Sequence, residues 1–427
     1  MKFRKILAVV SALCMMCAVV PFTEQNVPER AVLSVSAAEK ITVGMLTYTK
    51  YEDYAVLSGC NTLALNVEIA SEIDGLPVTS IAMSAFYNCT TLKTVVIPEG
   101  IISIGDKAFY NCSALTSVNI PDSVTSMGIY VFNGCSSLDS VVIPAGVTSI
   151  AGGAFYGCSA MTSVVIPDSV TSIENVAFGN CSALKSVKIP DSVTSIGGSA
   201  FADCSSLTSV EIPDSVTSVG SGAFENCSSL TSAKISGSVK KIESSAFEDC
   251  SDLTKLEIME GVQEIGLSAF QNCTSLLSVT IPESVTTINN AFSSCSSLAT
   301  VTVLNPYCNI SDGYTSLGSN IVKTQDRVIV IYGEENSTAQ AYAEKFADYG
   351  YVFSVIGSQP ATEPETEPVT ESLDDDITYM KENQITLDFN NNGVIDSADA
   401  AKLLKYAAAK GAGTVSNLKE FLQKEEA

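Results

Sequence analysis

Cysteine recurs at a fixed interval through the middle of this 427-residue chain. Nine cysteines follow one another at intervals of 23 residues, and a tenth follows after 22. They are Cys89, Cys112, Cys135, Cys158, Cys181, Cys204, Cys227, Cys250, Cys273 and Cys295. A unit this short cannot bury its own apolar face, so its copies must stack and share one continuous core. The spacing therefore predicts a repeat solenoid.

One copy of the repeat shows how a coil is built. It reads Leu207-Thr-Ser-Val-Glu-Ile-Pro-Asp-Ser-Val-Thr-Ser-Val-Gly-Ser-Gly-Ala-Phe-Glu-Asn-Cys227. Val210 and Ile212 alternate with polar neighbours, which is the period of a strand with one buried side. A Pro-Asp-Ser turn separates them from a second apolar pair, Val216 and Val219. We expect one coil per copy, with the strands of successive coils paired in a parallel sheet.

The composition restricts the chemistry that this chain can perform. Histidine is absent, and imidazole is the usual general base near neutral pH, so Ser/His/Asp and Cys/His catalysis is excluded. The formal net charge of -24 opposes binding to nucleic acid and to anionic membranes. Tryptophan is absent too, which removes the largest ring for stacking on sugars. These facts favour a binding protein over an enzyme.

The first 38 residues have the features of a secretory signal. Lys2, Arg4 and Lys5 precede an apolar run over residues 6–20, and small residues before position 39 offer a cleavage site after Ala38. An uncleaved membrane anchor is the alternative, although the run is short for a bilayer span. We therefore expect a secreted bacterial protein, extracellular or associated with the cell surface, whose mature chain has no transmembrane segment.

The cysteine ladder has three interpretations in an exported protein. Stacked coils point all the thiols in the same direction, which favours small buried side chains that fill a narrow corner of the coil. A disulfide framework and an array of metal-binding thiolates are the alternatives. Cys60 and Cys308 are expected to lie outside the ladder, near opposite ends of the array, and so cannot pair with each other.

The repeat resembles the BspA-type leucine-rich repeats of bacterial surface and secreted proteins. The marks of the resemblance are the recurring Ile-Pro-Asp-Ser-Val-Thr-Ser-Ile, the Ala-Phe pair before each cysteine, and a first segment over residues 73–81. It implies a leucine-rich repeat solenoid with short turns or helical segments, spanning residues 39–357 with a cap at each end. Residues 328–356 look like the last cap, in the order strand, helix, strand. The family implies adhesion or ligand recognition.

The outward positions of the coils give candidate partner surfaces. The residue between the two inward strand positions alternates in sign over Lys188, Glu211, Lys234 and Glu257, so each charge is expected to face an opposite charge in the next coil. Solvated pairing in register explains this column without any partner. Apolar and aromatic positions are the partner-surface candidates, with ordinary packing as the alternative. They are Val142, Val165, Tyr87, Tyr110, Tyr130 and Tyr156.

A different module is predicted after the array. Residues 358–376 are rich in Pro, Thr and Glu and lack an apolar period, which is typical of an extended linker. Beyond it, oxygen-bearing side chains stand at the spacing of a calcium loop, with Gly393 at the sharp bend. The predicted calcium ligands are Asp388, Asn390, Asn392, the Val394 carbonyl, Asp396 and Asp399. An Asn/Gly-rich turn before a helix is the alternative.

Residues 377–427 are similar to dockerin modules, which attach secreted proteins to cohesin domains of a scaffold, as in a cellulosome. The likeness rests on Asp399 at the last loop position and on the Leu-Leu-Lys-Tyr helix that follows. It implies cohesin contacts through Ser397, Ala398, Lys405 and Tyr406. Dockerin modules normally carry two such loops, and this sequence has one.

The sequence thus predicts a secreted, non-catalytic recognition or adhesion protein. Its array binds a protein or a glycan, and its calcium-loop module docks to a cohesin-bearing scaffold. An architectural surface adhesin with a purely structural calcium loop is the alternative. A polysaccharide-degrading glycoside hydrolase that uses paired carboxylates is the least favoured, because no coil shows two acids in a setting like a pocket.

Overall fold

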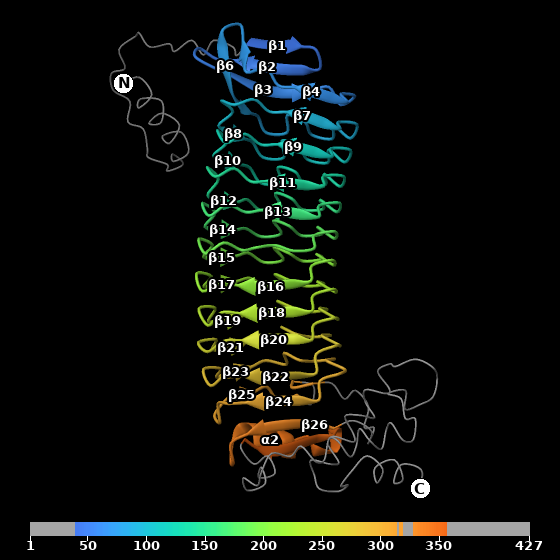
Figure 1. Ribbon diagram of the computed structural model, residues 1–427, viewed down its shortest axis with the longest axis vertical. Coiled ribbons are helices and arrows are strands. Elements are labelled where there is room, and N and C mark those ends of the chain that lie inside the picture. Colours follow the sequence, from blue (N-terminus) through green and yellow to red (C-terminus); the bar gives the residue numbers. More distant parts are fainter. Residues whose placement is uncertain (1–38, 314–315, 319–327, 357–427) are drawn as a thin grey trace, which may run out of the picture. The chain divides into compact units, whose positions relative to one another are not determined.

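The computed structural model describes residues 39–313, 316–318 and 328–356. Over this part of the chain the predicted repeat solenoid is confirmed. Figure 1 shows its coils stacked along the long axis, with strands of successive coils side by side in two columns and a cap at each end. All pairing between coils is parallel, with partners separated by one repeat, as between Ser209 and Ser232.

The first strand of each coil is the segment with two inward apolar residues. These strands are β4 (Asn66–Glu68), β7 (Thr94–Val96), β9 (Ser117–Asn119), β11 (Ser140–Val142), β13 (Ser163–Val165), β16 (Ser209–Ile212), β18 (Ser232–Ile235), β20 (Lys255–Ile258), β22 (Ser278–Ile281) and β24 (Thr300–Val303). Buried and exposed residues alternate along them, as the period of two predicts. Their ladder is divided into short sheets, and residues 186–189 form no strand.

The second strand of each coil is shorter and its ladder is more continuous. These strands are β8 (Ser103–Ile104), β10 (Ser126–Met127), β12 (Ser149–Ile150), β14 (Ser172–Ile173), β15 (Ser195–Ile196), β17 (Ser218–Val219), β19 (Lys241–Ile242), β21 (Glu264–Ile265), β23 (Thr287–Ile288) and β25 (Asn309–Ile310). The eight strands from β12 to β25 form one sheet. Each of these strands from β8 to β23 buries its second residue, usually isoleucine, in the core, and Ile310 of β25 is partly buried.

Turns form the third side of each coil, around the Ala-Phe pair. Their backbone groups also pair from coil to coil, as when the Phe201 N–H donates to the Ala223 carbonyl at 2.8 Å. The residue before each cysteine of the 23-residue ladder has a left-handed backbone, for example Asn226 at φ 58° and Asp249 at φ 60°. Asparagine, aspartate and glycine tolerate this conformation best, which explains why the repeat ends in Asn-Cys or an equivalent.

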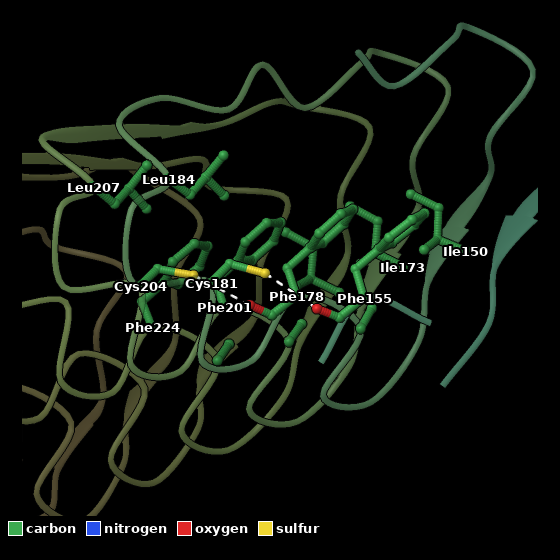
Figure 2. Packing of buried hydrophobic residues seen from close by; sticks show 14 of the residues in the cluster. Ile150, Phe155, Ile173, Phe178, Cys181, Leu184, Phe201, Cys204, Leu207 and Phe224 are labelled. Carbon is green, nitrogen blue, oxygen red and sulfur yellow. Dashed lines mark hydrogen bonds between the residues drawn. The ribbon is translucent and has the colours of Figure 1, made fainter. Parts of the chain in front are cut away.

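Phenylalanine forms the centre of the core. One ring from each coil stacks on the next from Phe86 to Phe292, with centroids 4.6–5.6 Å apart and nearly parallel planes. All ten rings are buried. Figure 2 shows four of them in line beside the thiols of Cys181 and Cys204. Each phenylalanine inside the array is therefore packed against a phenylalanine of both neighbouring coils.

The cysteines are buried small side chains, as expected, and they also hydrogen-bond. Each ladder thiol from Cys112 to Cys295 donates to the carbonyl of a phenylalanine in the preceding coil, as Cys204 does to Phe178 at 3.3 Å. Every cysteine of the described residues is free, so the disulfide alternative finds no support there. Burial raises the pKa of the Cys204 thiol to about 12. This thiol is held neutral in the core.

Cys60 lies outside the ladder, as expected, but close to its first thiol. It is half-buried, and its thiol donates to the Asn61 carbonyl at 3.3 Å, while the Cys89 thiol approaches the same oxygen at 4.0 Å. Cys60 therefore lies beside the first member of the ladder, at the end of the strand over residues 55–60. The 23-residue spacing does not reveal this, because Cys60 and Cys89 are further apart in sequence.

The first coils are closed by an antiparallel cap. It contains β1 (Glu39–Val43), β2 (Leu46–Lys50) and β3 (Ala55–Cys60), and a short hairpin of β5 (Glu72–Ile73) and β6 (Leu76–Ile81) leads into the second strand column. Tyr48 and Leu57 are buried against the first coil, and the Ala70 N–H donates to the Tyr48 hydroxyl at 3.0 Å. The cap covers a sheet edge that would otherwise be exposed.

The last coil is closed in the predicted order of strand, helix and strand. The elements are β26 (Ile329–Gly333), α2 (Thr338–Lys345), the 3₁₀ turn η1 (Ala347–Tyr349) and β27 (Tyr351–Val355). Ser337 accepts from the Gln340 N–H as the helix N-cap. Tyr342 is buried beneath the helix and donates to the Gly313 carbonyl at 2.7 Å.

Candidate recognition surfaces

Four tyrosines lie along the turn side of the first half of the array. We call this set, Tyr87, Tyr110, Tyr130 and Tyr156, the tyrosine edge. Tyr87 and Tyr110 stack with centroids 5.1 Å apart, and 43% of Tyr87 is exposed. Tyrosine offers a rigid apolar ring with a polar tip, the combination that is enriched in protein interfaces.

The other two tyrosines lie over glycines of the next coil. A side chain at Gly153 would collide with the ring of Tyr130, and Lys107 approaches that ring at 5.9 Å from its centroid. Tyr156 accepts a hydrogen bond from the Asn180 amide at 2.9 Å, which fixes its hydroxyl. The tyrosine edge is thus ordered by contacts within the array.

The two valine candidates lie on a different side of the coil. Val142 and Val165 are paired in register on β11 and β13, and they are 65% and 57% exposed. Val96 on β7 is exposed in the same outward column. The structure therefore places the candidate valines on the strand face and the candidate tyrosines on the turn side, so they do not form one site.

The charged part of the same outward column is paired as the sequence predicts over three coils. Lys234 lies in register with Glu211 on one side and Glu257 on the other. Its ammonium is 2.6 Å from the Glu211 carboxylate, and this hydrogen bond raises the pKa of Lys234. Glu257 forms its closest ion pair with Lys255 of its own strand, which lowers the pKa of Glu257. Lys188 is exposed but lies outside any strand.

A hollow of about 1140 Å³ runs beside this charged column, along the turns that follow the first strands. Its walls include the side chains of Lys234, Glu211 and Asp214 and the turn of Gly237. A side chain at Gly237 would collide with the Glu260 carbonyl, so two turns approach each other closely at one end. Sequence reasoning missed this hollow; the replacement of Pro-Asp by Ser-Gly at residues 236–237 is the signal that marks it.

The turn side becomes acidic in the second half of the array. Glu225 and Glu248 occupy the repeat position that Tyr87 and Tyr110 occupy near the first cap. Burial raises the pKa of Glu225, and the nearby carboxylates of Glu248, Asp203 and Asp249 raise it further. Within the described residues, no group of three or more Cys, Asp or Glu side chains is arranged to hold a metal ion.

The predicted calcium ligands (Asp388, Asn390, Asn392, Val394, Asp396 and Asp399) and cohesin contacts (Ser397, Ala398, Lys405 and Tyr406) lie outside the described residues. So do the predicted signal segment, the linker and the dockerin-like module. In the part of the chain that the structure describes, no helix has the length and apolarity needed to span a bilayer.

Comparison with known families identifies the repeat. The sequence matches the profile of the BspA type leucine rich repeat region (6 copies) over residues 66–185 and again over 171–299. Together the matches span residues 66–299, more than half of the 427 residues. The comparison with curated proteins found no match.

Several solved structures of bacterial leucine-rich repeat proteins are similar to this chain. One from Bacteroides ovatus ATCC 8483 is 24% identical, covers 74% of this chain and 99% of its own, and has a TM-score of 0.42. A leucine rich cell surface protein from Faecalibacterium prausnitzii A2-165 is 27% identical, with coverages of 67% and 99% and a TM-score of 0.37. The leucine-rich repeat protein of T. pallidum is 26% identical, with coverages of 56% and 91% and a TM-score of 0.32.

Proposed function

This chain belongs to the family of BspA-type leucine-rich repeat proteins, and from that membership we propose that its array binds a protein or a glycan through the tyrosine edge. Proteins of this family are bacterial surface or secreted proteins that act in recognition and not in catalysis. Export by residues 1–38 belongs to the same proposal, because recognition at the cell surface requires it. The proposal needs no catalytic residue in any coil.

The observation that carries the proposal is the exposed, ordered aromatic surface. Tyr87 and Tyr110 are stacked, Tyr156 is fixed by Asn180, and Met83 and Ile129 add exposed apolar side chains on the same turns. Clusters of exposed aromatic and apolar side chains mark binding sites in soluble proteins. Their order within the array reduces the entropy lost when a partner binds.

The experiment measures binding of the whole chain to arrays of glycans and of surface proteins. The variant Tyr87→Ala/Tyr110→Ala/Tyr156→Ala is expected to lose at least about tenfold in affinity, because tyrosines commonly dominate interface energy. The matched control is Glu225→Ala/Glu248→Ala, at the same repeat position in the acidic half, which should bind as the unaltered chain does. Equal binding by the tyrosine variant would contradict the proposal.

For the C-terminal module we propose calcium binding at residues 388–399 and docking to a cohesin domain. The spacing of oxygen ligands and the glycine at the bend support calcium, and the likeness to dockerin modules supports docking. Calorimetric titration of calcium into the whole chain tests the first part, with Asp388→Ala/Asp399→Ala as the control that should remove the heat. Cohesin capture with and without chelator tests the second part.

The outcomes separate the two functions that the sequence left open. Calcium-dependent cohesin capture makes the chain a recognition protein attached to a scaffold. Calcium binding without capture makes the module a stabilising end piece of an adhesin, and the tyrosine edge remains its binding surface. Absence of calcium binding would remove the docking proposal.

A further inference from the structure

The charges of the outward column on the strand face alternate in sign from coil to coil. Ion pairs within one chain do not account for the whole of this alternation. Four successive coils carry Lys188, Glu211, Lys234 and Glu257 at the same outward position. Strand register places the last three directly beside one another. The hollow of about 1140 Å³ is lined by Lys188, Glu211 and Lys234, so these side chains border open space. The column is neutral in sum, although the chain carries a net charge of -24.

The order of the charges is complementary to itself when reversed. Read in one direction it is positive, negative, positive, negative, and read in the other direction every sign is exchanged. When two copies face each other with opposite directions, Glu211 meets Lys234 of the second copy and Lys188 meets its Glu257. When the two copies run in the same direction with their coils level, every charge meets a charge of the same sign, which is unfavourable.

We propose that this strand face binds a second copy of the same chain, with the two solenoids antiparallel. The twofold axis runs parallel to the strands and passes between the coils of Glu211 and Lys234. Such an interface is isologous, because each copy contributes the same surface. The ion pairs within each copy persist, and each charge gains an opposite neighbour across the interface.

The rest of the face agrees with this arrangement. In the same outward column, Val165 meets Thr280 of the second copy and Val142 meets its Thr302. A second outward column lies two residues earlier in each first strand, from Thr94 to Thr300. Lys255 is its one charged residue, and it meets Ser186 of the second copy. Among these paired positions no like charges meet, and the small serine and threonine side chains allow the two sheets to approach closely.

The size of the face sets the expected strength. Ten coils at about 4.8 Å each and a width of about 10 Å give roughly 500 Å² per copy. This area lies at the low end for specific interfaces, so we expect a weak, reversible dimer. Because exposed charges are screened by salt, the dimer should dissociate as the ionic strength is raised well above about 0.15 M. The surface is distinct from the tyrosine edge, which lies on the turn side.

Sedimentation of the whole chain over a range of concentrations tests the proposal. The unaltered chain is expected to form a dimer at low salt, and Lys234→Glu and Glu211→Lys should each weaken self-association at least about tenfold, because each brings like charges together. An equimolar mixture of the two variants should regain the dimer, since every position then meets its opposite. Lys107→Glu, exposed on the turn side and not on the strand face, makes the same charge change and should leave the dimer intact.

Each outcome is decisive. Recovery in the mixture supports the proposal and also shows that both variants are folded. A monomeric unaltered chain, as expected if residues 358–427 of the same chain occupy this face, would overturn it, and so would a mixture that stays monomeric while the unaltered chain dimerises. None of these results changes the binding expected at the tyrosine edge, which is measured separately with its own variants.

Discussion

The buried ladders and the outward columns of the array differ in how freely their residues change. The phenylalanine column is the same from Phe86 to Phe292, whereas the outward column of the first strands passes from valine through asparagine to lysine, glutamate and threonine. Each buried position contacts the same position in both neighbouring coils, so a substitution there disturbs two interfaces. An outward position contacts solvent on its free side. The interior therefore specifies the fold, and the exterior is free to specify partners.

The largest expected difference between the two regions is their response to alkali. Burial raises the pKa values of Cys204 and Cys250 to about 12, while unfolded thiols ionise near 9. Above pH 9 the unfolded chain releases protons that the folded chain keeps, so stability is full below that pH and falls as pH rises towards 12. Each such thiol contributes a loss of about 1.4 kcal/mol per pH unit.

Chemical denaturation under reducing conditions between pH 7 and 11 measures this effect. Replacing Cys204 and Cys250 by alanine should make the loss of stability with pH less steep. An unfolding midpoint that does not change between pH 8 and pH 11 would show that the thiols do not ionise on unfolding.

The next largest loss of stability is expected when one phenylalanine of the stack is replaced. Phe201 is buried and stacks on Phe178 and Phe224 at 5.2 and 5.3 Å. Phe201→Ala should reduce the free energy of unfolding by about 3–5 kcal/mol, because it opens a cavity in the core. Phe201→Leu is the matched control and should cost much less. Denaturant midpoints measure both, and a loss below about 1 kcal/mol for alanine would contradict the comparison.

A smaller loss of stability is expected when a left-handed turn residue is replaced, and it should distinguish a turn asparagine from an outward one. Asn226 has φ 58° before its cysteine, and Asn119 stands exposed in the outward column. Asn226→Ala should cost about 1 kcal/mol, since alanine tolerates this backbone poorly, and Asn226→Gly should cost less. Asn119→Ala should change the thermal midpoint very little. Equal shifts for both alanine variants would remove the distinction between turn and outward positions.

The smallest effect is expected at the ion pair of the outward column. Lys234 and Glu211 are exposed, and pairs of this kind contribute between 0 and about 1 kcal/mol. A double-mutant cycle with alanine at both positions, read from denaturant midpoints at low and high salt, measures the coupling. A coupling above about 2 kcal/mol would mean that the outward column also specifies the fold.

Much of the fold could be predicted because the same pattern of apolar and turn residues recurs in each copy of the repeat. The alternation of Val210 and Ile212 placed the first strand, Val219 placed the second, and the segment from 328 to 356 has the predicted cap order. A first cap was expected, but its antiparallel strands were not predicted, since β1 to β3 occur once and lack the repeat. The hydrogen bonds from thiols to phenylalanine carbonyls were missed because they join residues 25 or 26 positions apart, which no local pattern reveals.

The candidate surfaces could be predicted in part. Exposure of Val142 and the alternation of charge around Lys234 follow from the strand period, which also fixes their register. The hollow did not follow, because it depends on how closely the turns of Gly237 and Glu260 approach, and that distance is set by backbones a full coil apart. The separation of the valines from the tyrosines onto different sides required the positions of the turns.

The coil-to-coil hydrogen bonds described for Phe201 and its neighbours also determine how the array would yield to tension. These bonds run along the long axis, so a force that pulls the ends apart loads them one coil at a time. A coil of 23 residues adds about 75 Å of extended chain when it peels away, against about 5 Å of folded length. Force spectroscopy should therefore record a series of small, evenly spaced releases, and the array would lengthen many-fold before its last coil unfolded.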